Sequence, residues 1–131
     1  MTEVAITPTP WQPVCQRSDL VADSGVCVLV GDVSAAGPLA PRRSIALFFI
    51  PHAEQQLYAI DNWDPIAGAG VIARGIIAEV DGELTVASPL YKQHFRLRDG
   101  QCLEDPGIRL DTFAAAFDGD TVVIASMPDS P

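Results

Sequence analysis

Residues 76–87 read IIAEVDGELTVA, and this stretch decides the fold. Two runs rich in aliphatic and β-branched residues, 76–80 and 84–87, flank the pair Asp81-Gly82. An Asp-Gly pair between such runs is a strong signal for a β-hairpin, because a type I′ turn needs a positive φ at both central residues. We therefore predict two antiparallel strands joined by a tight turn.

The same pattern extends in both directions along the chain. Asp-Gly recurs at 99–100 and 118–119, and further short apolar runs predict strands at 26–31, 44–50, 57–60, 94–97 and 121–125. The Ala-rich stretch that starts at Phe113 fits either a strand or a short helix, and a single helical turn is expected within 19–23. No long stretch combines helical periodicity with caps. The predicted class is therefore all-β, a small sandwich or barrel of antiparallel strands.

Size and composition set further limits. The chain has 131 residues, of which 48% are hydrophobic and 19% are charged, as expected for one folded domain. Eight Lys and Arg against 17 Asp and Glu give a net charge of −9. That charge argues against nucleic acid or an anionic membrane surface as a partner. No run is long enough to cross a bilayer, and the first ten residues do not resemble a secretory signal.

The predicted domain organisation is a flexible tail at 1–12, one domain at 13–126 and a flexible tail at 127–131. Two long Gly- and Pro-containing loops, 32–43 and 61–75, interrupt the strand pattern. Three cysteines at 15, 27 and 102 cannot all pair within one chain. We expect free, mostly buried thiols and a cytoplasmic location.

Several catalytic motifs are weak or absent. Residues 68–73 match G-x-G-x-x-G/A, but no central strand precedes them and a hairpin follows, so we expect a plain glycine loop. His94 and Cys102 are possible cross-strand neighbours, which is too few ligands for a metal site. No Ser or Cys lies in a recognisable nucleophile motif. We expect no catalytic residue and no metal site on this chain.

The strongest local feature combines the stretch VASPLYKQHFRL at 86–97 with NWD at 62–64. Together they resemble the two loops of Rieske-type iron–sulfur domains, which carry C-x-H and C-P-x-H and hold a [2Fe–2S] cluster. The resemblance implies a Rieske-like antiparallel β-sandwich or barrel with two former cluster-binding loops. Here Asn62 and Ser88 take the thiolate positions, and Asp64 and Tyr91 take the imidazole positions. Because amide and hydroxyl groups do not replace thiolates, we expect no cluster.

One subgroup of this family, the small subunits of assimilatory NAD(P)H-dependent nitrite reductases, is similar along most of the chain. The similarity is carried by ordered signatures, among them GVC at 25–27, YAIDN at 58–62, RGIIAE at 74–79 and CLED at 102–105, and the loop at 32–43 looks like an insertion. It implies a non-catalytic subunit in nitrate assimilation. Its large-subunit partner would carry siroheme, flavin and a [4Fe–4S] cluster and would reduce nitrite to ammonium.

Two alternatives stay open at this stage. In the first alternative the chain is an electron carrier that holds iron through unexpected ligands. In the second it is a docking module of another redox complex. A docking surface would use residues of the two loops: Trp63, Pro65, Ile66, Pro89, Leu90, Tyr91 and Lys92. Alternatively, Trp63 and Leu90 fill the space that a cluster would have occupied.

Overall fold

The structure is a computed structural model that describes residues 11–31 and 42–125. Its elements are strands and two short 3-10 turns, in the order β1 (Trp11–Gln16), η1 (Arg17–Asp19), β2 (Ser24–Gly31), β3 (Arg42–Phe49), β4 (Leu57–Asp61), β5 (Trp63–Asp64), β6 (Ala69–Gly70), η2 (Ile72–Arg74), β7 (Ile76–Val80), β8 (Glu83–Ala87), β9 (His94–Arg96), β10 (Thr112–Phe113), β11 (Ala115–Asp118) and β12 (Thr121–Ala125). All pairings between these strands are antiparallel. The predicted all-β class is confirmed.

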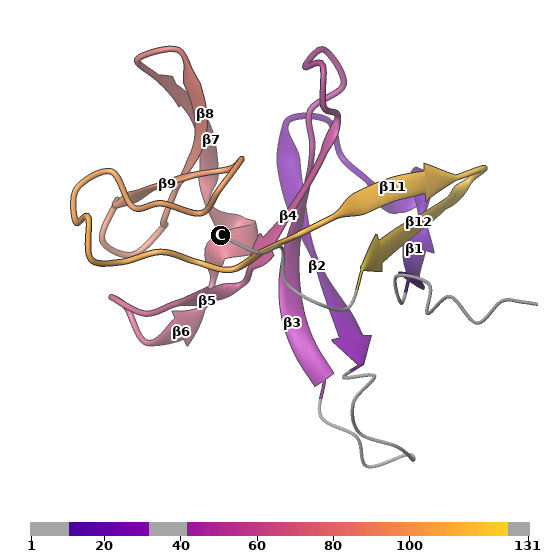
Figure 1. The fold of residues 1–131 in the computed structure, drawn as a ribbon, viewed down its shortest axis with the longest axis horizontal. Coiled ribbons are helices and arrows are strands. Elements are labelled where there is room, and N and C mark those ends of the chain that lie inside the picture. The colour runs from indigo at the N-terminus through magenta and orange to yellow at the C-terminus, as the bar shows by residue number, and fades with distance from the viewer. Residues whose placement is uncertain (1–10, 32–41, 126–131) are drawn as a thin grey trace, which may run out of the picture.

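The strands divide into two halves (Figure 1). One half holds the sheet β1-β12-β11 and the sheet β10-β4-β3-β2, and the other holds the sheet β7-β8-β9 and the hairpin β5-β6. In Figure 1 the β5–β9 half lies on the left and β1, β11 and β12 lie on the right, with β2, β3 and β4 between them. We call the β5–β9 half the loop lobe, because it carries both former ligand loops.

Strand β3 joins the two halves because both of its faces are buried. Its side chains alternate between two hydrophobic clusters: Ile45 and Leu47 pack in one, and Ala46 and Phe48 pack in the other. All four are fully buried. A strand covered on both faces needs apolar residues at successive positions, which explains the continuous apolar run at 45–50.

The hairpin predicted at 81–82 is confirmed. Val80 pairs with Glu83, and the two turn residues Asp81 and Gly82 have φ values of 51° and 81°. This is the pair of positive φ angles that a type I′ turn requires.

The other two Asp-Gly pairs form different turns from those predicted. The Arg96 amide donates to the Gln101 carbonyl, so residues 97–100 form a four-residue loop rather than a two-residue turn. The reason is that Leu97 is buried in the core, on the same face as Phe95, whereas Arg98 is exposed. This is the alternation of apolar and charged residues along 95–98. At the third pair, Asp118 pairs with Thr121, so the turn residues are Gly119 and Asp120. Gly119 has a φ of 64° at the first turn position, as in a type II′ turn.

The structure also decides the type or the bounds of three other predicted segments. The Ala-rich stretch after Phe113 is a strand, because residues 115–118 pair with β12. The predicted helical turn within 19–23 lies earlier, as η1 at Arg17–Asp19. Trp11 and Gln12, placed in the predicted tail 1–12, begin β1 and pair with Ala125 and Ile124. The remainder of that tail, the tail at 127–131 and most of the loop at 32–43 lie outside the described residues.

Cysteine burial follows the expectation only in part. Cys102 is buried and Cys15 is half-buried, but Cys27 is exposed. Cys27 lies on β2, which is the outer strand of its sheet among the described residues. Strand alternation turns Val26 and Val28 toward the interior and Cys27 away from it.

Candidate functional site

The first former ligand loop is built around the buried side chain of Asn62. Its Nδ2 donates to the Ser44 hydroxyl at 3.1 Å and to the Gly70 carbonyl at 3.2 Å. Its Oδ1 accepts from the amide of Ala73 at 2.7 Å. Asn62 therefore uses its whole amide group to close the loop against β3, and it offers no free donor atom to a ligand.

Asp64 is fully buried in the same loop. Its Oδ1 accepts from the amides of Ile66 and Ala67 at 2.9 and 3.1 Å, which shapes the turn between β5 and β6. Its Oδ2 accepts from the hydroxyl of Ser88 in the second loop. Asp64 is therefore both a turn-forming residue and a link to the other loop.

Ser88 is also fully buried, and it begins a compact turn at 88–93. Its amide donates to the Gln93 carbonyl at 2.8 Å, and its carbonyl accepts from the Lys92 amide at 3.0 Å. Lys92 adopts a φ of 66°, which a turn that returns on itself requires. The turn projects Pro89, Leu90 and Tyr91 beyond the end of β8.

The four former ligand positions therefore behave differently in the fold. Asn62, Asp64 and Ser88 are buried, and the hydrogen bond between Asp64 and Ser88 joins the two loops. Tyr91 is 61% exposed and does not join them. The four groups are an amide, a carboxylate, a hydroxyl and a phenol, which do not match the two thiolates and two imidazoles that a Rieske cluster requires. These residues do not fit a [2Fe–2S] cluster.

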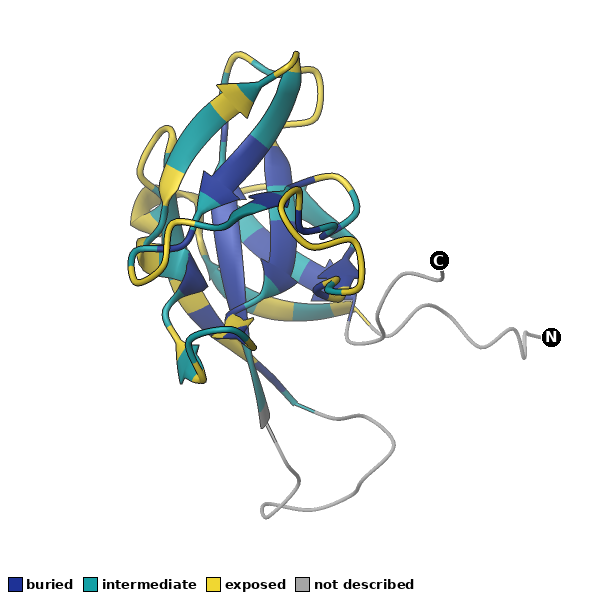
Figure 2. Cartoon of the chain, turned by 90° about the vertical axis from the view of Figure 1, so that its left-hand side faces the viewer, coloured by how far each residue is buried: buried dark blue, intermediate teal, exposed yellow. Residues whose placement is uncertain are grey.

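The predicted docking residues lie mainly on the surface. Trp63 is 53% exposed and Leu90 is 52% exposed, so about half of each side chain is available to a partner. Pro65 and Lys92 are exposed and Pro89 is half-buried, whereas Ile66 packs against the core. Figure 2 views the molecule from the loop lobe and shows exposed residues in its loops and buried residues behind them. We call Trp63, Leu90 and Tyr91 the apolar tip.

Gln93 and Arg74 were not among the predicted site residues. Gln93 Oε1 is buried without a hydrogen-bond partner within the described structure, beside the turn that Ser88 begins. Arg74 is exposed at the end of η2. The only sequence signal for Arg74 is that it is the sole cation in the loop at 61–75.

His94 and Cys102 both contact the carboxylate of Glu104. His94 Nδ1 lies 2.7 Å from Glu104 Oε2, and the Cys102 thiol lies 3.8 Å from the other oxygen of the same carboxylate. Burial raises the pKa of the Cys102 thiol. Within residues 11–31 and 42–125, no three His, Cys, Asp or Glu side chains are arranged to hold a metal ion.

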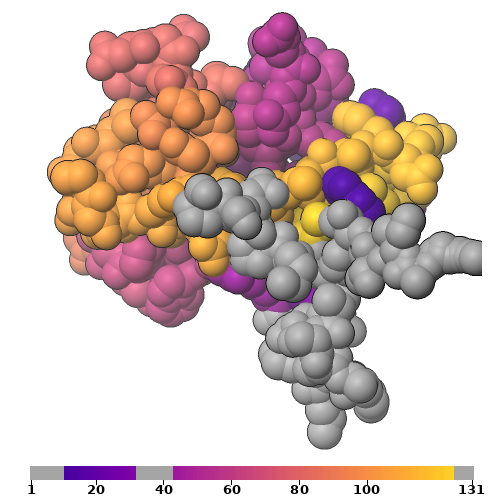
Figure 3. Space-filling model, in the orientation of Figure 1, coloured from indigo at the N-terminus to yellow at the C-terminus, as the bar shows by residue number. Residues whose placement is uncertain are grey.

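Charged residues at the end of β9 and in the loop that follows it support the loop lobe through ion pairs. Arg96 Nε donates to Asp99 Oδ1 at 2.8 Å, and this guanidinium holds the pKa of Asp99 below its usual range. Arg98 binds Glu83 on β8 and likewise lowers the pKa of Glu83. In Figure 3 this segment, in orange, covers the left of the molecule between the β7–β8 hairpin and the β5–β6 hairpin.

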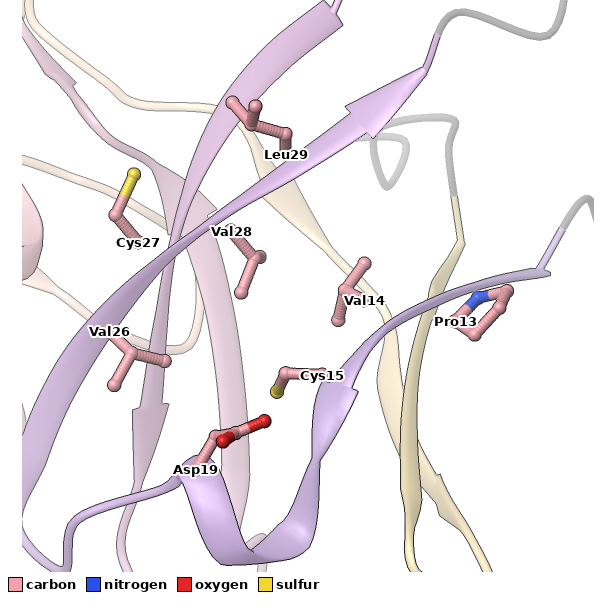
Figure 4. Close-up of a pocket in the computed structure, with 8 residues that line it drawn as sticks. All are labelled: Pro13, Val14, Cys15, Asp19, Val26, Cys27, Val28 and Leu29. Atoms are coloured by element: carbon pink, nitrogen blue, oxygen red, sulfur yellow. The ribbon is translucent and has the colours of Figure 1, made fainter.

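An open groove lies in the other half of the molecule, between β1 and β2 (Figure 4). It is lined by residues of β1, η1 and β2: Pro13, Val14, Cys15, Asp19, Val26, Cys27, Val28 and Leu29. Burial and the charge of Asp19 both raise the pKa of Cys15, which keeps its sulfur a thiol rather than a nucleophilic thiolate. We find no catalytic arrangement in this groove.

The segment at 68–73 is not a dinucleotide-binding loop. Ala69 and Gly70 form β6 of a two-stranded antiparallel hairpin, and the three-residue η2 follows in place of an α-helix. A pyrophosphate site of that kind needs the N-terminus of a true helix.

In the described part of the chain, no helix has the length and apolar character needed to cross a membrane.

Comparisons with known proteins agree with this fold. The chain matches the family described as a Rieske-like [2Fe-2S] domain over residues 10–125. It is 44% identical over 95 residues to the nitrite reductase (NADH) small subunit of Escherichia coli (strain K12), covering 72% of this chain and 78% of that protein. A solution structure of the nitrite reductase [NAD(P)H] small subunit from Erwinia carotovora gives a TM-score of 0.64 at 41% identity and covers 92% of this chain and 84% of that one.

A third relative has a different organisation. A segment of the nitrite reductase [NAD(P)H] large subunit of Klebsiella oxytoca is 39% identical to this chain over 101 residues. The match covers 76% of this chain and 9% of that protein. A domain of this kind therefore also occurs inside a large-subunit polypeptide.

Proposed function

We propose that this chain, which belongs to the Rieske-like family of nitrite reductase (NADH) small subunits, is a non-catalytic docking subunit without an iron–sulfur cluster. Its partner would be the large subunit of a cytoplasmic NAD(P)H-dependent nitrite reductase that converts nitrite to ammonium. The large subunit would hold the siroheme, flavin and [4Fe–4S] groups that this chemistry uses. A reducing compartment suits the three free thiols of the chain.

The observation that carries the proposal is the hydrogen bond between Asp64 and Ser88. In a cluster-bearing member the metal joins the two loops. Here two of the replacing side chains bind each other, which supports a link between the loops that is made by protein groups. The fold thereby keeps the end of the molecule at which the cluster would lie, without the electron-carrying group.

The Klebsiella oxytoca relative supports a large-subunit partner. In that protein a domain similar to this chain is covalently part of the large subunit. A domain that is fused in one protein and separate in another is expected to make a specific contact in both. We place that contact at the apolar tip, because exposed aromatic residues are typical interface anchors. The surrounding residues of the contact would be Pro65, Ile66, Pro89 and Lys92.

The test is co-purification of the chain with the large subunit and the effect of Trp63→Ala on that binding. We expect the affinity to fall about tenfold or more, because an exposed Trp at an interface centre is a frequent hot spot. The melting temperature should stay unchanged, since Trp63 belongs to neither hydrophobic cluster.

Trp11→Ala is the matched control, because Trp11 is 44% exposed on β1 in the other half. It should leave binding unchanged. Equal affinities for the wild type and Trp63→Ala would contradict the docking role of the tip. Normal growth on nitrite after deletion of this chain would count against the nitrite reductase assignment itself.

A further inference from the structure

The loops around the apolar tip have a charge opposite to that of the whole chain. The net charge is −9. Within the loop residues 62–75 and 88–93, however, the only carboxylate is Asp64, which is fully buried, and the cations Arg74 and Lys92 are both exposed. Within these two loops the exposed charges are therefore both positive on a strongly acidic protein. The adjoining carboxylates are already bound, because Asp61 pairs with Arg43 and Glu104 binds His94.

These two cations also differ from the others in the described part of the chain. Arg17, Arg43, Arg96 and Arg98 each lie within 4.0 Å of a carboxylate oxygen. Arg109 donates to the main-chain carbonyl of Asp99. Among the side chains that the structure describes, Arg74 and Lys92 are the cations that make neither kind of contact with another described residue.

The fold places both cations beside the apolar tip. Lys92 follows Tyr91, and its amide donates to the Ser88 carbonyl. Arg74 ends η2, whose first residue, Ile72, donates its amide to the carbonyl of Asn62 next to Trp63. The adjoining Gly75 packs so closely on the end of β8 that an added Cβ would lie 2.5 Å from the Ala87 carbonyl oxygen.

The backbone that carries the tip adjoins buried, hydrogen-bonded groups. Trp63 lies between buried Asn62 and buried Asp64, and Leu90 and Tyr91 lie within the turn that Ser88 begins. The Asp64–Ser88 hydrogen bond fixes the two loops to each other. A surface that is ordered before binding loses less conformational entropy when it docks.

We propose, building on the docking role above, that the apolar tip inserts into an apolar depression on the large subunit whose rim carries carboxylates that pair with Arg74 and Lys92. Opposite charges at the contact orient the approach of a chain that is otherwise acidic. Partners with a basic or neutral rim would lose this attraction. The two cations act as specificity determinants, and the three tip residues supply the buried contact.

The experiment measures association of the full-length chain with the purified large subunit over a range of salt concentrations. The double variant Arg74→Glu, Lys92→Glu should bind about tenfold more weakly or worse at low salt. The difference from the wild type should shrink as salt screens the contact. The matched control is Arg17→Glu, which makes the same kind of charge reversal in the other half of the molecule and should change the affinity little.

Each outcome has a definite meaning. The carboxylate rim is refuted if the double variant binds the large subunit as tightly as the wild type. It is also refuted if Arg17→Glu lowers the affinity by half as many kcal/mol as the double variant, which reverses two charges. In both cases the docking function stands. If the wild type fails to bind the large subunit at any salt concentration, the proposed function itself is refuted. The melting temperature of each variant is measured as a control for folding. The double variant should melt at the wild-type temperature, because Arg74 and Lys92 are exposed.

Discussion

Replacing Ser88 with alanine is expected to lower the free energy of unfolding by about 3 kcal/mol, because it leaves a buried carboxylate oxygen of Asp64 without its donor. The cavity left by one hydroxyl is small, so the unpaired oxygen dominates the loss. Urea unfolding followed by circular dichroism measures the change. Ser18→Ala is the control, since Ser18 is exposed in η1, and it should cost less than about 0.5 kcal/mol.

A double-mutant cycle with Asp64→Ala separates the hydrogen bond from general packing. If the two side chains act as a pair, the double variant should lose clearly less than the sum of the single losses. Additive losses would mean that the two loops are held together by other contacts. The account of the Asp64–Ser88 link as the replacement for a cluster would then be wrong.

The second large effect is expected for Gly100→Ala. Gly100 has a φ of 79°, and a Cβ there would lie 2.0 Å from the Leu110 carbonyl oxygen and 2.9 Å from its carbon. The backbone must move to admit a methyl group, which also threatens the hydrogen bond from the Leu110 amide to the Gly100 carbonyl. We expect a loss of about 3 kcal/mol or more in the free energy of unfolding.

Gly82→Ala is the matched control for this prediction. Gly82 has nearly the same backbone angle, a φ of 81°, but a Cβ there meets no atom within 4 Å. It should therefore show only the conformational cost, about 1 kcal/mol. Equal losses for the two variants would show that the close approach of Leu110 has no energetic consequence.

Local rules predicted those parts of the fold in which a short stretch determines its own geometry. The hairpin at 76–87 follows from its alternation and from the two positive φ angles at Asp81 and Gly82. The run at 44–50 is predicted to be a strand because it is short and rich in residues that favour strands. Its continuous apolar run is consistent with burial on both faces, but the distant segments that form the two hydrophobic clusters around it are not given by the local pattern.

Longer-range contacts explain the local predictions that were wrong. The turn at Asp99-Gly100 widens because Leu97 enters the core, and Cys27 is exposed because β2 is an outer strand. The substituted ligand positions were visible in the sequence through their resemblance to a known motif. That Asp64 and Ser88 would bind each other was not, because the bond joins residues 24 positions apart through the packing of two loops.

The same limit applies to the proposed docking surface. The sequence offers Trp63, Leu90 and Tyr91 as docking candidates, and it equally allows Trp63 and Leu90 to fill the space of a lost cluster. Their exposed fractions became known only from the fold. Arg74 stood out only when the ion pairs of the other cations could be enumerated. An unpaired charge is a property of the folded surface and has no signature in a single sequence.

The most direct test of the account is the iron and acid-labile sulfide content of the purified chain after anaerobic incubation with iron and sulfide, together with its EPR spectrum after reduction. We predict no stoichiometric iron, no stoichiometric sulfide and no Rieske-type signal, because the four former ligand positions offer neither a thiolate nor an imidazole. Two irons and two sulfides per chain, with the spectrum of a [2Fe–2S] centre, would contradict the account and make this chain an electron carrier.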